Sequence, residues 1–262
     1  MVHGTLERPD PEALTEALRV ADVRDRMIAL AVPTRDVRIG MLAKGLVGAR
    51  ARRAATLAAA QQLRIDPAVV AVSLDHHGSE GTAYVAAPTD TVAKWVAPWS
   101  ADRWRVSVVE PAGTALLREA GRDTVELFVR TGAGTLDVVV GSRTRWVLAR
   151  TVDLDWEHNL PSARVEVEDT ITLVRKVGVE LGGLVVGGAG AAGILADALS
   201  TLGTIRPLMV GAGLDADLPP EALVAASVAQ WDRQRRSQKG LGWSDRMPGL
   251  TRLWRRRRSN AA

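Results

Sequence analysis

The stretch "LGGLVVGGAGAAGILADALSTLG", residues 181–203, decides the fold of this chain. It has the pattern of a short apolar strand, a turn at Gly187 and Gly188, and then a helix. Glycine adopts positive φ easily and lets another group approach the backbone closely. Two explanations therefore stay open: a plain strand-to-helix turn packed against the chain itself, or a turn that faces a nucleotide.

The segments around this stretch alternate between strand and helix patterns. Upstream we expect three consecutive strands, joined by tight turns, and then a long helix with Val165, Ile171 and Val174 among its apolar positions. The elements of this second set are expected at residues 124–130, 135–142, 144–153, 162–180, 182–188, 192–203, 205–212 and 219–231. Their order, βββαβαβα, predicts an α/β fold in which helices cover a mixed sheet.

The first part of the chain also mixes both element types. Helices are expected at residues 9–21, 46–63, 89–101 and 112–121, strands at 26–33, 36–43 and 104–111, and a hairpin over 68–88. Trp95 and Trp99 are four residues apart and so share one helical face, with Trp104 close behind. Core packing explains this cluster, and an aromatic groove for a partner is the alternative.

The composition excludes several kinds of site. The 262 residues contain no cysteine, which excludes disulfides, thiolate metal sites and a cysteine nucleophile. No Gly-x-Ser-x-Gly nucleophile turn is present. The pair His76–His77 is expected at a solvated hairpin tip, because adjacent strand residues point to opposite faces and rarely reach one metal ion. We also expect neither a signal peptide nor a transmembrane span.

The net charge of +4 is unevenly distributed. Residues 232–262 hold ten basic and two acidic residues, whereas residues 1–231 hold 24 basic and 28 acidic ones. A nucleic-acid-binding domain is expected to carry its basic patch on the fold itself, and we do not expect one on this acidic body. No nucleic-acid partner is therefore expected.

The basic tail also carries apolar residues. Leu250, Leu253 and Trp254 have the spacing of one helical face, and Arg255, Arg256, Arg257 and Arg258 follow directly. This pattern suits an anionic membrane surface. A disordered solubilising tail and a nucleic-acid contact are the alternatives.

The order of the second set resembles a ribonuclease-H-like domain, two of which form the actin, Hsp70 and sugar-kinase superfamily. "LFVRTGAGTLDVVV", residues 127–140, resembles the second phosphate hairpin of that superfamily, with Gly132 and Gly134 in the turn. The opening stretch resembles its adenosine turn, with Gly187, Gly188 and Gly190 in the matching positions. These five glycines are the candidate cofactor-binding residues, as a relic of a nucleotide site.

Within the superfamily the chain resembles PilM, the actin-like component of type IV pilus machinery, over about residues 10–231. Three further stretches carry the resemblance: "IALAVPTRDVRIGMLA", "TAYVAAPTDTVAKWV" and "RVSVVEPAGTALLREA". The resemblance implies an α/β actin-like (ribonuclease-H-like) fold, with mixed sheets flanked by helices and a small inserted α+β subdomain. The expected organisation is a truncated first half over 1–121 with the insert at about 35–88, a second half over 122–231, and a basic flexible tail over 232–262.

The departures from the family pattern bear on activity. No glycine hairpin with an Asp precedes residue 10, and Arg130 or Thr131 occupies the place where the family has an Asp in its second hairpin. Without acidic groups to orient Mg²⁺, phosphoryl transfer loses its main electrostatic support. Asp137 is expected to be an exposed strand residue. We therefore expect no catalytic residues, no metal site, no ATP hydrolysis and no cofactor beyond weak binding of Mg-ATP.

The resemblance implies a non-catalytic scaffold at the inner face of the cytoplasmic membrane, in a machine for pilus assembly, DNA uptake, twitching or secretion. Its expected partner is the short N-terminal cytoplasmic peptide of a single-span inner-membrane pilus assembly protein. The expected groove lies near residues 26–45 and 82–110. An actin-like ATPase with divergent phosphate loops is the alternative.

Overall fold

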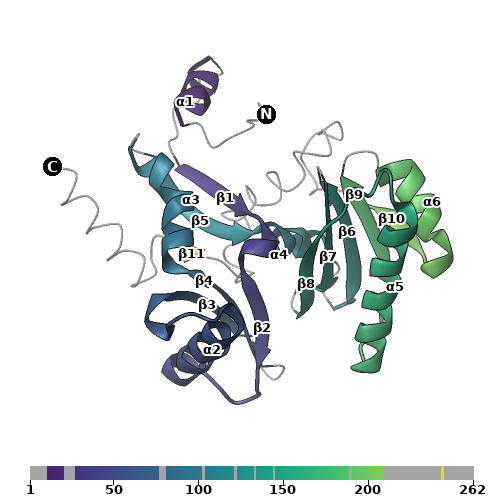
Figure 1. Cartoon of the computed structure of the whole chain (residues 1–262), viewed down its shortest axis with the longest axis horizontal. Coiled ribbons are helices and arrows are strands. Elements are labelled where there is room, and N and C mark those ends of the chain that lie inside the picture. The colour runs from purple at the N-terminus through teal and green to yellow at the C-terminus, as the bar shows by residue number, and fades with distance from the viewer. Residues whose placement is uncertain are drawn as a thin grey trace.

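The computed structural model describes residues 11–20, 27–76, 81–101, 104–120, 123–132, 134–143, 145–188, 191–208 and 243–244. Three β-sheets organise this part of the chain (Figure 1). The first has the order β1-β5-β11, with β1 (Met27–Val32) parallel to β5 (Arg105–Pro111) and β11 (Trp243–Ser244) antiparallel to β5. The second is antiparallel, in the order β2 (Arg38–Leu42), β4 (Thr82–Pro88), β3 (Val70–His76).

The third sheet belongs to the second half of the chain and has the order β10-β9-β6-β7-β8. Its strands are β6 (Glu126–Gly132), β7 (Thr135–Gly141), β8 (Trp146–Asp153), β9 (Leu184–Gly188) and β10 (Ile205–Pro207). The first three form an antiparallel meander, and β9 and β10 add in parallel beside β6. The mixed sheet predicted from the βββαβαβα order is confirmed.

Helices connect and cover these sheets. They are α1 (Pro11–Val20), η1 (Thr34–Asp36), α2 (Gly48–Leu63), η2 (Pro67–Val69), α3 (Thr89–Ala101), α4 (Ala112–Leu116), η4 (Leu117–Glu119), α5 (Leu160–Lys176), the π-helical turn η5 (Ala191–Leu195), α6 (Ala196–Leu199) and η6 (Ser200–Leu202). Asn159 caps α5 by accepting a hydrogen bond from the Ser162 backbone N–H. Among the described helices, none combines the length and apolar character needed to cross a membrane.

The inserted subdomain lies between β1 and β5 in the sequence and at the lower left in Figure 1. It consists of the β2-β4-β3 sheet with α2 packed on one face. Buried alanines on α2, including Ala55 and Ala59, lie against Tyr84 and Val72 of the sheet. Alanine on the buried helix face keeps the helix close to the strands, so this small subdomain has a thin core of its own.

One hydrophobic core joins the two halves. It contains β5 and α4 residues from the first half, and Phe128, Val139 and Val185 from the inner face of the third sheet. The other face of that sheet packs on α5 through residues such as Leu127, with Ile171 on the helix. Because side chains alternate along a strand, the two cores use alternate residues of the same strands.

Some expectations need correction. Of the apolar positions named on this helix, Ile171 and Val174 are buried, whereas Val165 is 52% exposed on the outer face of α5. Trp243–Ser244, inside the predicted flexible tail, form a strand on β5. The predicted closing helix at 219–231, Gly190, His77 and the residues at 250–258 that are expected to bind a membrane lie outside the described residues.

Candidate functional site

The predicted phosphate hairpin is the connection between β6 and β7. Gly132 pairs with Thr135, which leaves a two-residue loop that contains Gly134. Gly134 has a φ of +65°, and a Cβ there would meet no atom within 4 Å. The positive φ alone explains this glycine, since tight hairpin turns need a residue that adopts the left-handed region without strain. A hairpin turn therefore accounts for Gly134, and the approach of Thr135 Oγ1, which would lie 2.7 Å from a Cβ on Gly132, accounts for Gly132.

Close packing within the chain accounts for Gly187 and Gly188. A Cβ on Gly188, whose φ is +103°, would lie 2.3 Å from the Thr131 carbonyl oxygen. A Cβ on Gly187 would lie 2.6 Å from the Leu208 Cβ. Both contacts are far shorter than real Cβ contacts, so the approach of β6 and Leu208 to β9 requires glycine at both positions. These contacts favour the first explanation for the opening stretch, a turn packed against the chain itself.

A polar row crosses the inner face of the third sheet beside these glycines. Arg130 on β6, Asp137 on β7 and Thr151 on β8 stand at paired positions of neighbouring strands. Arg130 donates to Asp137 Oδ2 from Nε at 3.0 Å and from Nη2 at 2.8 Å. Thr151 Oγ1 donates to Asp137 Oδ1 at 2.5 Å. Because three donors cover its carboxylate, Asp137 is only 3% exposed, which corrects the prediction of an exposed strand residue.

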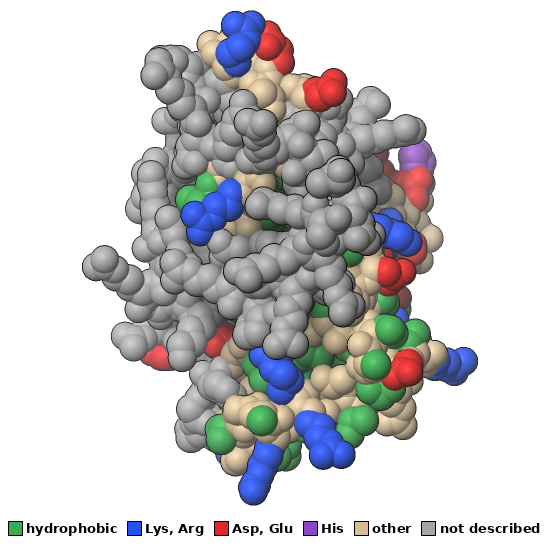
Figure 2. Space-filling view, turned by 90° about the vertical axis from the view of Figure 1, so that its left-hand side faces the viewer, with side chains coloured by type: hydrophobic (Ala, Val, Ile, Leu, Met, Phe, Trp, Pro, Cys, Tyr) green, Lys and Arg blue, Asp and Glu red, His purple; other side chains and the backbone are tan. Residues whose placement is uncertain are grey.

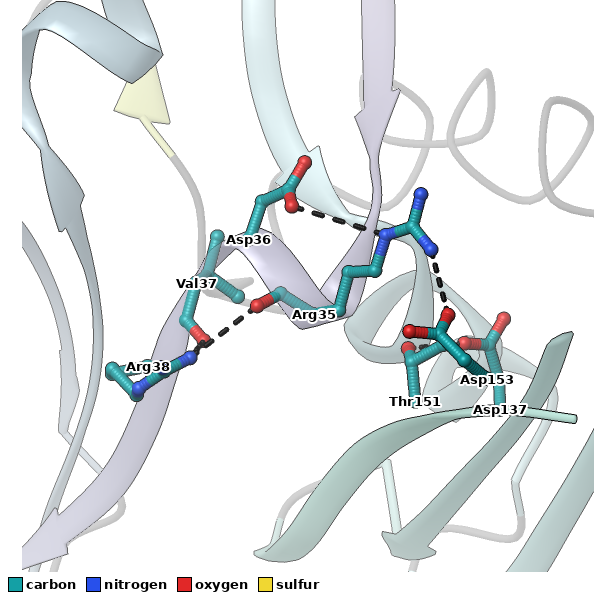
Figure 3. A network of polar contacts seen from close by, with 7 residues as sticks. All are labelled: Arg35, Asp36, Val37, Arg38, Asp137, Thr151 and Asp153. Carbon is teal, nitrogen blue, oxygen red and sulfur yellow. Dashed lines mark hydrogen bonds and ion pairs between the residues drawn. The ribbon is translucent and has the colours of Figure 1, made fainter. Parts of the chain in front are cut away.

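One ion pair crosses the seam between the two halves next to this row (Figure 3). Arg35 on η1 donates from Nη1 to Asp153 Oδ1 at the end of β8, at 2.7 Å. Both side chains are more than half exposed, so water screens the pair strongly. The two residues are 118 positions apart, and nothing in the sequence pattern predicts their contact.

A third carboxylate, that of Glu110, lies in the first half. Glu110, at the end of β5, forms a buried ion pair with Arg118 and accepts a hydrogen bond from Thr114 Oγ1 at 3.1 Å. Burial raises the pKa of Glu110 above its ordinary value, against the opposing effect of Arg118. The Glu110 carboxylate is thus enclosed in the protein core.

These contacts do not fit a Mg²⁺-nucleotide site. The three carboxylates discussed, Glu110, Asp137 and Asp153, are each engaged by an arginine of the same chain. Mg²⁺ binds through carboxylates that can face its hydration shell. Within the described part of the chain no group of three or more His, Cys, Asp or Glu residues is placed to hold a metal ion. The guanidinium of Arg130 is likewise already paired with an anion.

Residues 26–45 and 82–110, near which the peptide groove is expected, supply strands to the first two sheets and meet at the junction of those sheets. In the described part of the chain β1 is an outer strand of its sheet, and most of its apolar residues are only partly buried. Met27 is 39% exposed and Ala31 is exposed on the same face. A half-exposed apolar outer strand is the kind of surface to which an extended peptide adds.

The tryptophans near this junction are core residues. Trp99 and Trp104 are 7% and 5% exposed and meet edge to face, with ring centroids 6.4 Å apart. Trp104 Nε1 also donates to Thr15 Oγ1, which ties α1 to the core. For these two residues the structure supports core packing over an aromatic partner groove.

A shallow cavity of about 340 Å³ lies between the inserted subdomain and the second half. Three separated segments of the chain supply its lining: Met41, Lys44, Arg145, Trp146, Val147, Val177 and Val179. Sequence reasoning missed this cavity, because its lining residues form no local pattern.

No protein-family model matches the sequence, and a search of curated proteins found no match. Solved structures do match. The chain is similar to a structure described as the PilM–PilN type IV pilus biogenesis complex, with a TM-score of 0.67, 17% identity and coverage of 87% of both chains. It is also similar to the cytoplasmic domain of EpsL, an inner-membrane component of the type II secretion system of Vibrio cholerae. That match has a TM-score of 0.52 and 17% identity, and covers 87% of this chain and 82% of the other.

The fold is therefore actin-like, as predicted. Within that class it is the fold of PilM and of the EpsL cytoplasmic domain, over most of the chain.

Proposed function

We propose that this chain is a non-catalytic scaffold of a type IV pilus-like or related secretion machine. It captures a short cytoplasmic peptide of a single-span inner-membrane protein and works at the inner face of the cytoplasmic membrane. The observation that carries the proposal is the fold shared with PilM and with the EpsL domain over 87% of the chain.

The contacts at the seam support the non-catalytic part of the proposal. Arg130 and Arg118 neutralise the buried carboxylates of Asp137 and Glu110, so these two carboxylates stabilise the fold rather than face a ligand. Breaking a buried pair to free its carboxylate for Mg²⁺ leaves the arginine without a partner, which costs roughly several kcal/mol.

The outer strand β1 supports the peptide-binding part. Strand addition satisfies backbone hydrogen bonds of both chains, and pockets for alternate side chains give specificity. In the described part of the chain β1 is the outer strand of its sheet, and the exposed side chain of Ala31 is a position at which the proposal can be tested.

The test is a calorimetric titration of the full chain with a synthetic peptide. The peptide is the N-terminal cytoplasmic segment of a single-span membrane protein encoded beside this chain. We expect one-to-one binding in the micromolar range, about −8 kcal/mol. Ala31→Arg places a bulky side chain on the outer strand and is expected to weaken binding at least about tenfold. Val165→Arg, a similar change on the exposed face of α5, is the matched control.

Two results contradict the proposal in separate ways. Equal peptide affinity in the two variants would show that the peptide does not bind at β1. Hydrolysis of Mg-ATP by the purified chain, above a heat-inactivated control, would overturn the non-catalytic assignment and favour a divergent ATPase.

A further inference from the structure

The outer face of α2 combines positive charge with exposed aliphatic side chains. Arg50, Arg53, Leu57 and Arg64 are all exposed and follow one another at intervals of three, four and seven residues. These intervals place them on one face of the helix and at its end. Figure 2 shows Lys and Arg side chains beside hydrophobic side chains at its lower end, the level at which Figure 1 places α2.

The inserted subdomain is the basic part of the folded body. Between residues 38 and 76 the sequence has six Lys and Arg residues and two Asp residues. Arg52 donates to the Val72 carbonyl oxygen and so serves the fold. The described contacts give the side chains of Lys44, Arg50, Arg53 and Arg64 no ion pair. This basic face corrects the prediction that the folded body carries no basic patch.

Two arginines of α2 occupy positions that lower the stability of the helix. Arg50 and Arg53 lie near its N-terminus, where the helix dipole disfavours positive charge. The N-cap residue is Val47, which makes no side-chain cap, and no acidic residue occupies the first turn. This arrangement lowers helix stability, and no contact among the described residues compensates for it, which indicates that these charges have a function outside the fold.

We propose that this face of α2 binds an anionic membrane surface. Around the arginines, Val47 is 63% exposed, Leu57 51% and Val69 47%. Aliphatic side chains gain free energy by entering the interface between lipid headgroups and acyl chains, whereas a nucleic-acid backbone offers them nothing comparable. The face is the convex surface of a helix and bears no aromatic side chain for base stacking. This inference rests on the α2 face alone, so peptide capture at β1 can fail without affecting it.

The test is cosedimentation of the full chain with phosphatidylcholine vesicles, with and without phosphatidylglycerol. Each near-surface Arg contributes about fivefold to binding of anionic membranes, so the double variant Arg50→Gln with Arg53→Gln should bind about 25-fold more weakly. Its matched control is Arg175→Gln with Lys176→Gln, which removes the same charge from exposed positions on α5. The control should stay within about twofold of the unmodified chain.

Leu57→Ser and Leu173→Ser form a second matched pair, because these leucines are 51% and 52% exposed on different helices. Only Leu57→Ser should weaken vesicle binding. Urea unfolding should show that the Arg50/Arg53 variant is no less stable than the unmodified chain, because it removes a clash with the helix dipole. This result separates loss of membrane contact from loss of folding.

Three results would overturn the proposal. Equal losses in the α2 and α5 charge variants would show a general charge effect. Vesicle binding that depends on Arg255–Arg258 and ignores Arg50 and Arg53 would assign membrane contact to the tail alone. Salt-dependent binding of duplex DNA that requires Arg50 and Arg53, with vesicle binding unaffected, would assign the face to nucleic acid.

Discussion

At the scale of single residues, glycine is required for different reasons at different positions of this chain. Gly134 is needed for its backbone conformation, because its surroundings are open. Gly188 needs both a positive φ and the absence of a side chain, because Thr131 lies against it. A motif of turn glycines therefore does not by itself identify a ligand, since the chain can be the group that approaches.

Replacing these glycines by alanine should separate the two reasons. Gly134→Ala should lower the free energy of unfolding by about 1 kcal/mol, the cost of a left-handed residue with a Cβ. Gly188→Ala adds a clash between β9 and β6 and should cost about 3–5 kcal/mol. Urea unfolding measures both values, and equal losses would refute the close approach of Thr131.

Glu110 shows how burial competes with an ion pair at one residue. Its pKa is raised, so the folded chain keeps this proton at a pH where the unfolded chain, with its ordinary value near 4.5, has lost it. The contribution of Glu110 to stability is therefore full at low pH and falls as the pH rises from about 4.5 through the folded pKa.

The expected pH dependence is measured against Glu110→Gln, which stays neutral. The stability of the unmodified chain relative to this variant should decrease as the pH rises above about 4.5. Urea unfolding across a pH series gives the difference. A relative stability that increases with pH would mean that Arg118 lowers the pKa of Glu110 more than burial raises it.

At the scale of elements, strand pairing gives the polar row a rigidity that the seam pair lacks. Arg130, Asp137 and Thr151 stand on three adjacent strands whose register holds them together. Arg35 and Asp153 are exposed and come from separate elements. Distance alone does not distinguish these contacts, but burial does.

Two substitutions test this difference. Asp137→Asn leaves the partly buried Arg130 without its counter-ion and should cost about 2–4 kcal/mol of unfolding free energy. Arg35→Gln removes a screened surface pair and should cost no more than about 1 kcal/mol. Thermal or urea unfolding measures both losses. A larger loss for Arg35→Gln than for Asp137→Asn would contradict the burial of the polar row.

At the scale of the whole molecule, one core couples the two halves. Phe128, on the second-half sheet, is 1% exposed and packs in the same cluster as β5 and α4 of the first half. Removal of its ring therefore affects both halves at once.

Phe128→Ala should lower the free energy of unfolding by about 3–5 kcal/mol through the lost burial and the cavity left behind. Tryptophan fluorescence and far-UV circular dichroism should still follow one shared transition, shifted to lower urea. Two separated transitions in the variant would show that each half has its own core and folds alone.

The sequence by itself determined the order of most of the described elements, because hydrophobic periodicity and turn residues are local signals. The strand–glycine–helix stretch, the α3 boundaries and the hairpin at 68–88 were all predictable in this way. The resemblance in the order of these elements also predicted the actin-like fold. Local signals do not say what lies against an element, so the explanation of Gly187 and Gly188 stayed open.

Only the tertiary structure decided which groups meet. Asp137 is buried because Arg130 and Thr151 stand on neighbouring strands. The sequence around Asp137 does not predict this burial. Arg35 meets Asp153 from 118 residues away. The basic face of α2 emerges because Arg50 and Arg53 are exposed on the helix, whereas Arg52 donates to the Val72 carbonyl oxygen of β3. Periodicity reports the environment of one element, whereas the chemistry of a site depends on contacts between elements that only folding brings together.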